Sequence, residues 1–271
     1  MSANNSTRQT LFIAAILCLV CSIVVSSAAV ILKPQQVANK LLDRNKNILS
    51  AAGLFDEDKH SDADVASLFA QFEPVFLDLR EGKLLSIDEA KGLNLDANTF
   101  DQKAASKVPE LSRKLSSEED TALIGRQAKY ALIYLLKEEG ELKRMVLPVH
   151  GYGLWGTLYG FMAVENDANT IAGLAFYSHK ETPGLGAKVD LPKWKALWPG
   201  KKIYEIKDDQ LNVRIKLTKG QANPDNSYEV DGLSGATLTS VGVSNLVQFW
   251  MGDLGYKPFM ASFTKQNVGG Q

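Results

Sequence analysis

Cysteine is almost missing from this sequence. Cys18 and Cys21 are the only two, and both lie in one apolar segment near the N-terminus. The rest of the chain therefore contains neither a disulfide nor a thiolate metal site. The three histidines, His60, His150 and His179, lack the spacing of metal ligands. No metal site is predicted, and a zinc enzyme is disfavoured.

An excess of charge of either sign is also missing. The 271 residues include 30 Lys and Arg against 31 Asp and Glu, which gives a formal net charge of −1. The basic residues are scattered among acids instead of forming a patch, so we expect no nucleic-acid partner. The length and an apolar fraction of 45% predict one or two domains with a sizeable core.

One long run without charge is present, at residues 11–32. A run of this length can span a bilayer as a helix. The alternative is a cleaved signal peptide, with Arg8 before the run and Ser27-Ala28-Ala29 at the cleavage site. We favour an uncleaved anchor, because the run is longer than a usual signal-peptide core. Basic residues are more numerous after the run than before it, so a literal positive-inside count would place the large domain in the cytoplasm.

Behind the anchor the patterns predict an α+β fold, in which an antiparallel sheet is flanked by helices. Apolar spacing predicts a helix that ends at Gly53, and Ser61 with Asp64 resembles the capping-box start of another. Residues 75–79 alternate as a strand, whereas residues 86–120 are polar and predict a surface excursion. The expected divisions are a short cytoplasmic N-terminus (1–10), the membrane helix (11–32), a helical or irregular part (33–128), a core (129–260) and a C-terminal tail (261–271).

Two hairpins are predicted in the core, residues 130–136 with 143–149 and residues 161–165 with 171–177. Between them, residues 151–156 form a formal G-x-G-x-x-G. A strand follows it instead of a helix, and this argues against a dinucleotide site. The turn either lies beside a flat ligand, with Gly153 and Trp155 in contact, or is a tight loop with a packed tryptophan.

Residues 178–188 contain two glycines and a proline. They form either a rigid turn that approaches a ligand or a plain connector between strand and helix. Further along, residues 193–198 predict a short helix whose two tryptophans pack in the core. Residues 213–217 alternate as another strand.

Hydroxyl residues and glycines are concentrated at residues 231–240, just before an apolar-periodic run. Its spacing predicts a helix from Thr237 to about Trp250, with Ser234 as the N-cap. The free N–H groups at a helix start attract anions, most often phosphate. On pattern alone, an ordinary capped helix is the simpler interpretation.

Three segments resemble those of one family. Asp231–Thr237 resembles the flavinylation motif D-x-x-[ST]-G-A-[ST], in which the last hydroxyl residue is joined to FMN by a phosphoester. His179–Gly186 resembles the second hallmark of FMN-binding domains of respiratory complexes, and Gly151–Gly160 fits the glycine-rich stretch upstream of it. In this order behind one anchor, they resemble the C subunits of the bacterial sodium-translocating NADH:quinone oxidoreductases. The G subunit of the Rnf complex is the alternative, but it is typically shorter than this chain.

The resemblance implies FMN bound covalently through Thr237. Further cofactor contacts are expected from residues of the three segments: Asp231, Ser234, Gly235, Ala236, Glu181, Thr182, Gly184, Leu185, Trp155 and Gly153. The implied role is a relay of single electrons from an iron centre to the flavin of the B subunit, as NADH reduces ubiquinone and sodium is exported.

The resemblance also implies partners and a location. The partners are the other subunits of the complex, especially B, D and E, and a separate flavin transferase, since a threonine hydroxyl is a weak nucleophile and no histidine base stands beside Thr237. The location is the bacterial inner membrane with the flavin domain in the periplasm, against the charge count. Two other hypotheses are an anchored module that holds a phosphate ligand without redox work and an assembly subunit that has lost its cofactor. The presence of Thr237 argues against both.

Overall fold

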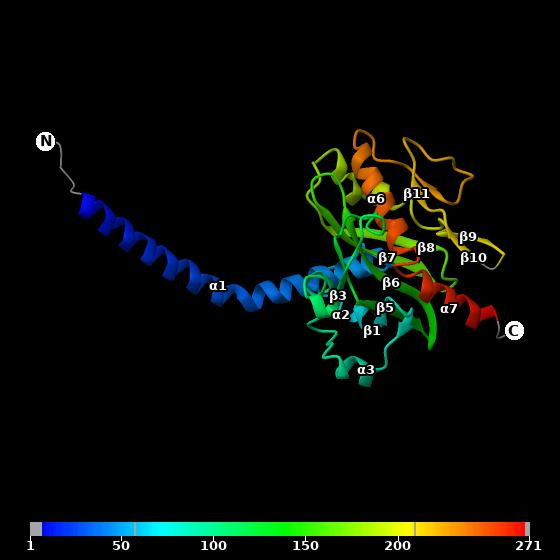
Figure 1. Cartoon of the computed structure of the whole chain (residues 1–271), viewed down its shortest axis with the longest axis horizontal. Coiled ribbons are helices and arrows are strands. Elements are labelled where there is room, and N and C mark those ends of the chain that lie inside the picture. The colour runs from blue at the N-terminus through cyan, green and yellow to red at the C-terminus, as the bar shows by residue number, and fades with distance from the viewer. Residues whose placement is uncertain (1–6, 57, 209, 269–271) are drawn as a thin grey trace. The chain divides into compact units, whose positions relative to one another are not determined.

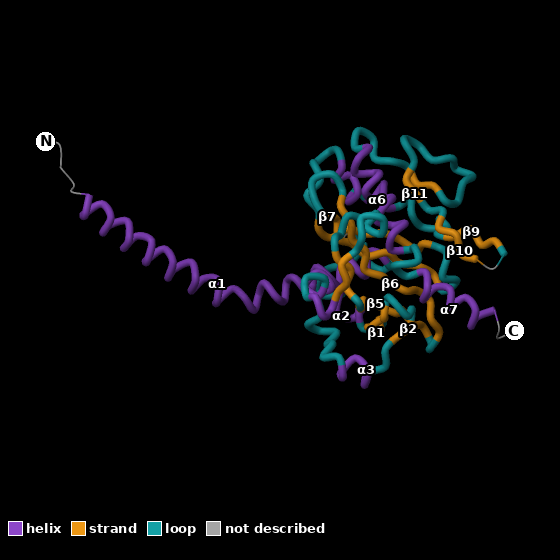
Figure 2. Tube along the Cα trace, in the orientation of Figure 1, coloured by secondary structure: helices purple, strands orange, loops and turns teal. Residues whose placement is uncertain are grey.

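The computed structural model describes residues 7–56, 58–208 and 210–268 (Figures 1 and 2). The chain divides into two compact units, residues 1–44 and residues 45–271. Of the predicted short N-terminus, residues 1–6 lie outside the described residues, and a helix has already begun at Thr7.

Helix α1 runs without interruption from Thr7 to Ala51. Among the described residues it is the one helix long and apolar enough to cross a membrane, with a mean hydropathy of 2.8 in its most apolar window. The predicted membrane segment, residues 11–32, lies within it and is exposed throughout. The sequence suggested a second helix after the anchor, but the chain stays helical through Pro34, so the two predicted helices are one.

A six-stranded antiparallel sheet forms the centre of the second unit, in the order β2-β1-β5-β6-β7-β8. The strands are β1 (Phe72–Asp78), β2 (Lys83–Leu84), β5 (Tyr130–Glu138), β6 (Glu141–Tyr152), β7 (Thr157–Glu165) and β8 (Ile171–Ser178). Both predicted hairpins are present. Glu139 and Gly140, both at positive φ, make the two-residue turn between β5 and β6. The core was expected to begin at residue 129, but β1 precedes it and pairs with β5 along its whole length.

Each face of the sheet is buried against a different layer. On one face, cross-strand neighbours such as Leu147 and Met162 belong to the main core, which also contains the inner side of α6 (Thr237–Trp250). On the other face, Val146 and Ala163 are neighbours, and the last turn of α1 covers this side. A Cβ at Gly173 would lie 2.4 Å from the carbonyl oxygen of Ala51, so glycine is needed for this close approach.

Short elements fill the connections. They are α2 (Val65–Phe69), α3 (Ile87–Gly92), α4 (Gln102–Ala105), η1 (Pro109–Leu111), β3 (Ser112–Lys114), β4 (Arg126–Ala128), η2 (Gly186–Asp190), α5 (Pro192–Lys195), β9 (Tyr204–Lys207), β10 (Gln210–Val213), β11 (Lys216–Leu217), β12 (Glu229–Val230) and α7 (Lys257–Val268). Helix α7 occupies most of the predicted C-terminal tail, and residues 269–271 of that tail lie outside the described residues.

Two local predictions are corrected. The N–H and hydroxyl of Ser61 do donate to the Asp64 carboxylate, each at 2.8 Å, but α2 begins only at Val65, with Asp64 itself at the N-cap position. The strand expected over residues 213–217 is two strands, because at Arg214 the backbone N–H turns away to the carbonyl of Ile203.

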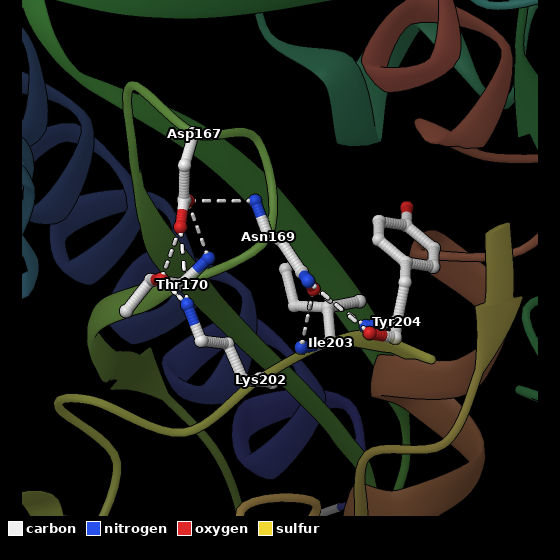
Figure 3. A network of polar contacts seen from close by, with 6 residues as sticks. All are labelled: Asp167, Asn169, Thr170, Lys202, Ile203 and Tyr204. Atoms are coloured by element: carbon white, nitrogen blue, oxygen red, sulfur yellow. Dashed lines mark hydrogen bonds and ion pairs between the residues drawn. The ribbon is translucent and has the colours of Figure 1, made fainter. Parts of the chain in front are cut away.

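The β7–β8 turn is tied to residues 202–204 by a polar network (Figure 3). The Asp167 carboxylate accepts hydrogen bonds from the N–H groups of Asn169 (2.9 Å) and Thr170 (2.7 Å) and pairs with Lys202. The Asn169 amide accepts from the N–H of Tyr204 at 2.7 Å and donates to its carbonyl at 3.1 Å. This network holds the edge of the sheet against the β9 segment.

Candidate functional site

The start of α6 is open. Ala236 occupies the N-cap position, no side chain caps the helix, and its first turn contains no acidic residue. The prediction that Ser234 is the N-cap is therefore wrong: Ser234 lies two residues too early, and the chain turns at Gly235 with φ +80° before the helix begins. The first N–H groups of a helix have no intrahelical partner, so here they are available to an anion. Thr237, the first helical residue, is exposed.

The loop before α6 is held by Ser240, a residue in the first turn of that helix. The hydroxyl of Ser240 accepts from the N–H of Leu233 at 2.8 Å and donates to the carbonyl of Ala236 at 3.1 Å. Ser240 is buried, so this small network fixes the loop geometry without occupying the open helix start. Sequence reasoning did not identify Ser240, although its place one turn after Ala236 is the spacing at which such contacts form.

Two further residues secure the same loop from neighbouring segments. The indole N–H of Trp194 donates to the Asp231 carbonyl at 3.2 Å, and the Lys188 ammonium donates to the Ser234 carbonyl at 2.9 Å. The Asp231 carboxylate accepts from the N–H of Ala222 at 2.9 Å, so Asp231 anchors the preceding turn. Lys188 also brings a positive charge to the region before Thr237.

Glu181 joins two of the predicted segments to the first turn of α6, which begins at the end of the third. Its carboxylate accepts from the N–H groups of Leu154 (3.0 Å) and Trp155 (3.1 Å) and from the hydroxyl of Thr239 (2.6 Å). Glu181 is only 5% exposed and Thr239 is fully buried. The structure therefore brings together the glycine-rich turn, the 179–186 loop and the first turn of α6.

Apolar side chains stay exposed around this junction. Trp155 is 61% exposed on the 153–156 turn, and Leu185 is 44% exposed on the neighbouring loop. A Cβ at Gly235 would lie 3.1 Å from the Leu185 side chain, so Leu185 borders the residues just before Thr237. Gly184 adopts φ +75°, which explains the glycine at that turn. Thr182 is exposed, and its carbonyl accepts the N–H groups that close the loop.

A groove of about 390 Å³ includes Thr237 in its lining. Its walls are α6 and the 216–220 segment, and it is lined by Thr237, Ser240, Val241, Ser244 and Gln248 together with Lys216, Leu217, Thr218, Lys219, Gly220, Gly232 and Leu233. Its lining includes Lys219 and several hydroxyl groups, whereas Lys216 already pairs with Glu229 at 3.4 Å.

The region before residue 129 also reaches the site. The carbonyl of Ala122 accepts the N–H of Tyr152 at 2.8 Å, just before the turn that carries Trp155. The sequence predicted a polar surface excursion at residues 86–120, and polarity alone does not indicate that the backbone just after it will support a distant turn.

The residues present fit an FMN group. The uncapped helix start and Lys188 suit its phosphate, the exposed Thr237 offers a hydroxyl, and Trp155 and Leu185 offer flat apolar surface to a ring. No cluster of three or more His, Cys, Asp or Glu is arranged to hold a metal ion within the described ranges.

Comparison with known proteins agrees with this geometry. Residues 153–252 match the model of the FMN-binding domain family. The C subunit of the Na⁺-translocating NADH-quinone reductase of Pseudomonas aeruginosa is 44% identical over 269 residues, which cover 98% of this chain and 99% of the relative. The Vibrio anguillarum C subunit is 43% identical, with 96% of each chain covered. The chain belongs to the family of C subunits of Na⁺-translocating NADH-quinone reductases.

Solved structures show the same fold. The crystal structure of Shewanella oneidensis NqrC matches with a TM-score of 0.73 at 32% identity and covers 84% of this chain and 99% of that one. The C subunit of the reductase of Parabacteroides distasonis matches with a TM-score of 0.63 at 24% identity, and the match covers 84% of this chain and 96% of that one. The predicted family and the α+β fold of an apolar helix followed by an antiparallel-sheet domain are thus confirmed. As a member of this family, the chain is a subunit of an oxidoreductase.

Proposed function

We propose that this chain carries FMN joined by a phosphoester to Thr237 and relays single electrons from an iron centre to the flavin of the B subunit. In this role it serves NADH-to-ubiquinone electron transfer coupled to sodium export. The observation that carries the proposal is an exposed threonine at the first position of a helix with no cap and no acid in its first turn. A phosphodiester at this place would keep one negative charge, which the helix start stabilises.

The chain's own residues have distinct tasks in this proposal. Gly235 and Ala236 let the backbone approach the phosphate, while Asp231, Ser234 and Lys188 hold the loop in place. Trp155 and Leu185 contact the ring, and the loop with Thr182 and Gly184 brings polar groups to its edge. The FMN supplies the electron-carrying chemistry when bound, and the protein orients it and limits its contact with water.

The exposed hydroxyl of Thr237 suits modification by a separate flavin transferase. The hydrogen bonds of His179 go to Asp190 and to the N–H of Glu181, and a threonine hydroxyl is a weak nucleophile by itself, so we assign the modification to a separate enzyme. We place α1 in the inner membrane and the flavin domain in the periplasm, with the B, D and E subunits as neighbours. Protease treatment of intact spheroplasts tests this orientation: digestion of the domain supports it, and full protection would reverse it.

The attachment is tested by flavin fluorescence after denaturation. Full-length wild type, Thr237→Val and Thr237→Ser are expressed with the transferase, denatured and illuminated on a gel. We expect a fluorescent band for wild type, no band for the valine variant and a retained band for serine, which keeps the hydroxyl. Peptide mass spectrometry then locates the adduct. A valine variant as fluorescent as wild type would refute Thr237 as the attachment site.

A further inference from the structure

We propose that Glu181 is a positioning residue, whose buried carboxylate locks the turn carrying Trp155 to the first turn of α6. The proposal rests on the proposed function in one respect: the position of Trp155 matters because its indole contacts a flavin attached at Thr237. The lock itself involves only the polypeptide and exists with or without flavin.

The two oxygens of the Glu181 carboxylate bind two different segments of the chain. One oxygen accepts the N–H groups of Leu154 and Trp155 at 3.0 and 3.1 Å, and the other accepts the Thr239 hydroxyl at 2.6 Å. One oxygen can accept both N–H groups because it has two lone pairs, and the second oxygen stays available to Thr239. Thr239 lies two residues after Thr237, so the bonds connect the turn with Trp155 directly to the helix start.

Two glycines make room for this carboxylate. A Cβ at Gly153 would lie 2.5 Å from one Glu181 oxygen, and a Cβ at Gly186 would lie 2.6 Å from the other. The Gly186 Cβ would also come within 2.7 Å of the Thr239 hydroxyl. These two glycines of the family segments thus have a defined task. They let the backbone close around Glu181.

Glu181 itself is held by a second contact. Its N–H donates to the Nδ1 of His179 at 3.1 Å, and the Nε2 of His179 lies 2.5 Å from the Asp190 carboxylate. The side chain is buried and already bound by three donors, so it acts on the flavin through Trp155 and Thr239. This is a different task from the direct cofactor contact that the family resemblance implies.

An exposed indole on a glycine turn needs such a restraint. The turn of residues 153–156 has one internal backbone bond, from the N–H of Gly153 to the carbonyl of Gly156 at 2.8 Å. Trp155 is largely exposed, so burial does little to fix it. Binding surfaces are effective when their groups are fixed before the ligand arrives. The hydrogen bonds from the N–H groups of Leu154 and Trp155 to the Glu181 carboxylate fix the turn in place.

The lock is tested first without flavin. In full-length Thr237→Val protein, hydrogen exchange is followed at the N–H groups of Leu154 and Trp155. We expect Glu181→Ala to speed exchange at both by about tenfold, the loss of one amide hydrogen bond, while the core strands exchange at unchanged rates. Glu181→Gln should restore slow exchange, because its amide oxygen accepts both N–H groups and its NH₂ faces Thr239. Glu141→Ala, at an exposed glutamate beside the β5–β6 turn, is the matched control.

The second test uses protein that carries flavin at Thr237. Tryptophan beside a flavin quenches its fluorescence. We therefore expect Glu181→Ala to lose quenching at equal covalent flavin content, and Glu181→Gln to keep it. Thr239→Val, which removes one of the three bonds, should lose part of the quenching, and Thr239→Ser should keep it.

The outcomes separate the two proposals. Unchanged exchange at Leu154 and Trp155 in Glu181→Ala, or unchanged quenching in a variant with full covalent flavin, overturns the positioning role. If Glu181→Ala does not fold, Thr239→Val decides by quenching: a partial loss that Thr239→Ser does not show supports the role, and full quenching in Thr239→Val overturns it. A wild type without covalent flavin would refute the proposed attachment instead, and the exchange test would still report on the lock.

Discussion

The β7–β8 turn and the start of α6 are both rich in polar groups, but they use them differently. In the turn, Asp167, Asn169 and Thr170 bind one another and the backbone at Tyr204 (Figure 3). At the start of α6, no side chain caps the helix and Thr237 is exposed. Polar groups that satisfy one another stabilise a fold, whereas groups left open at a helix start are available to a ligand. The first region is therefore assigned to stability and the second to binding.

Acid should have the largest effect on stability, and it acts at neither region but at His150, which lies under the last turn of α6. The His150 ring packs 4.9 Å from that of Trp250, the last residue of the helix. Burial, aided by the charge of Lys103, lowers the pKa of His150 from 6.5 to about 4. The unfolded chain therefore takes up this proton at higher pH than the folded one. The stability that depends on the neutral ring is complete above pH 6.5 and is lost as the pH falls towards 4, by about 2–3 kcal/mol.

We expect His150→Gln to remove most of this loss between about pH 7 and pH 4.5, measured by chemical denaturation. Tyr159→Phe keeps the ring that stacks on His150 and should keep the loss. The Asp167 turn should not contribute in this range. Burial would raise the pKa of Asp167, but hydrogen bonds from Thr170, Asn169 and Lys202 outweigh it and hold that pKa below its usual 3.8. A loss that persists in His150→Gln and vanishes in Asp167→Ala would mean that the turn at Asp167, and not His150, makes stability depend on acid.

The second-largest effect on the free energy of unfolding is expected from Asp167→Ala at neutral pH. The carboxylate accepts two backbone N–H groups and the Thr170 hydroxyl, so its removal should lower the free energy of unfolding by about 1–2 kcal/mol. The side chain is partly exposed, and its pairing with Lys202 adds little. Covalent flavin per protein should stay at the wild-type level.

Asp225→Ala serves as the control for Asp167, since Asp225 is an exposed residue of another turn. It should change neither stability nor flavin content. If Asp167→Ala abolished flavin attachment in a folded protein, the separation of a stability region from a binding region would fail.

What the sequence could predict was local. The two hairpins were visible because alternation and turn residues lie within a few positions of one another. The pairing of β1 with β5 could not be predicted. Residues 79–129 separate the two strands in the sequence, and pairing over such a distance leaves no periodic signal. The continuity of α1 through Pro34 was missed because a proline usually marks a helix boundary.

The site was predictable in its segments and less so in its contacts. Motifs identified Thr237, Trp155 and Glu181, and the structure brings their segments together. The burial of Glu181 was unexpected, because charged residues are usually exposed and the space for it depends on Gly153 and Gly186 from two other segments. Ser234 was misplaced as a cap because a hydroxyl before an apolar run is the usual signal, and the turn at Gly235 cannot be inferred from that signal.

The smallest effect is expected from a substitution that places a negative charge at the open start of α6. Leu238 is the second residue of α6 and is 61% exposed, so a change there disturbs little packing. Leu238→Asp places a carboxylate where the helix dipole favours negative charge, and we expect the flavin-free protein to gain about 0.5 kcal/mol of stability. The same carboxylate repels an incoming phosphate. Flavin attachment should therefore slow, and more so at low salt, because exposed charges are less screened there.

Leu238→Asn separates charge from the loss of the leucine. It has nearly the same shape as aspartate without the charge, so it should show neither the added stability nor the salt-dependent slowing. The measurement is covalent flavin against time at two salt concentrations, beside denaturation of the unmodified protein. Equal slowing by both variants would mean that Leu238 acts through apolar contact. In that case the open helix start, with its positive dipole end, would not explain why a ligand binds at Thr237 and not at the hydrogen-bonded turn of Asp167.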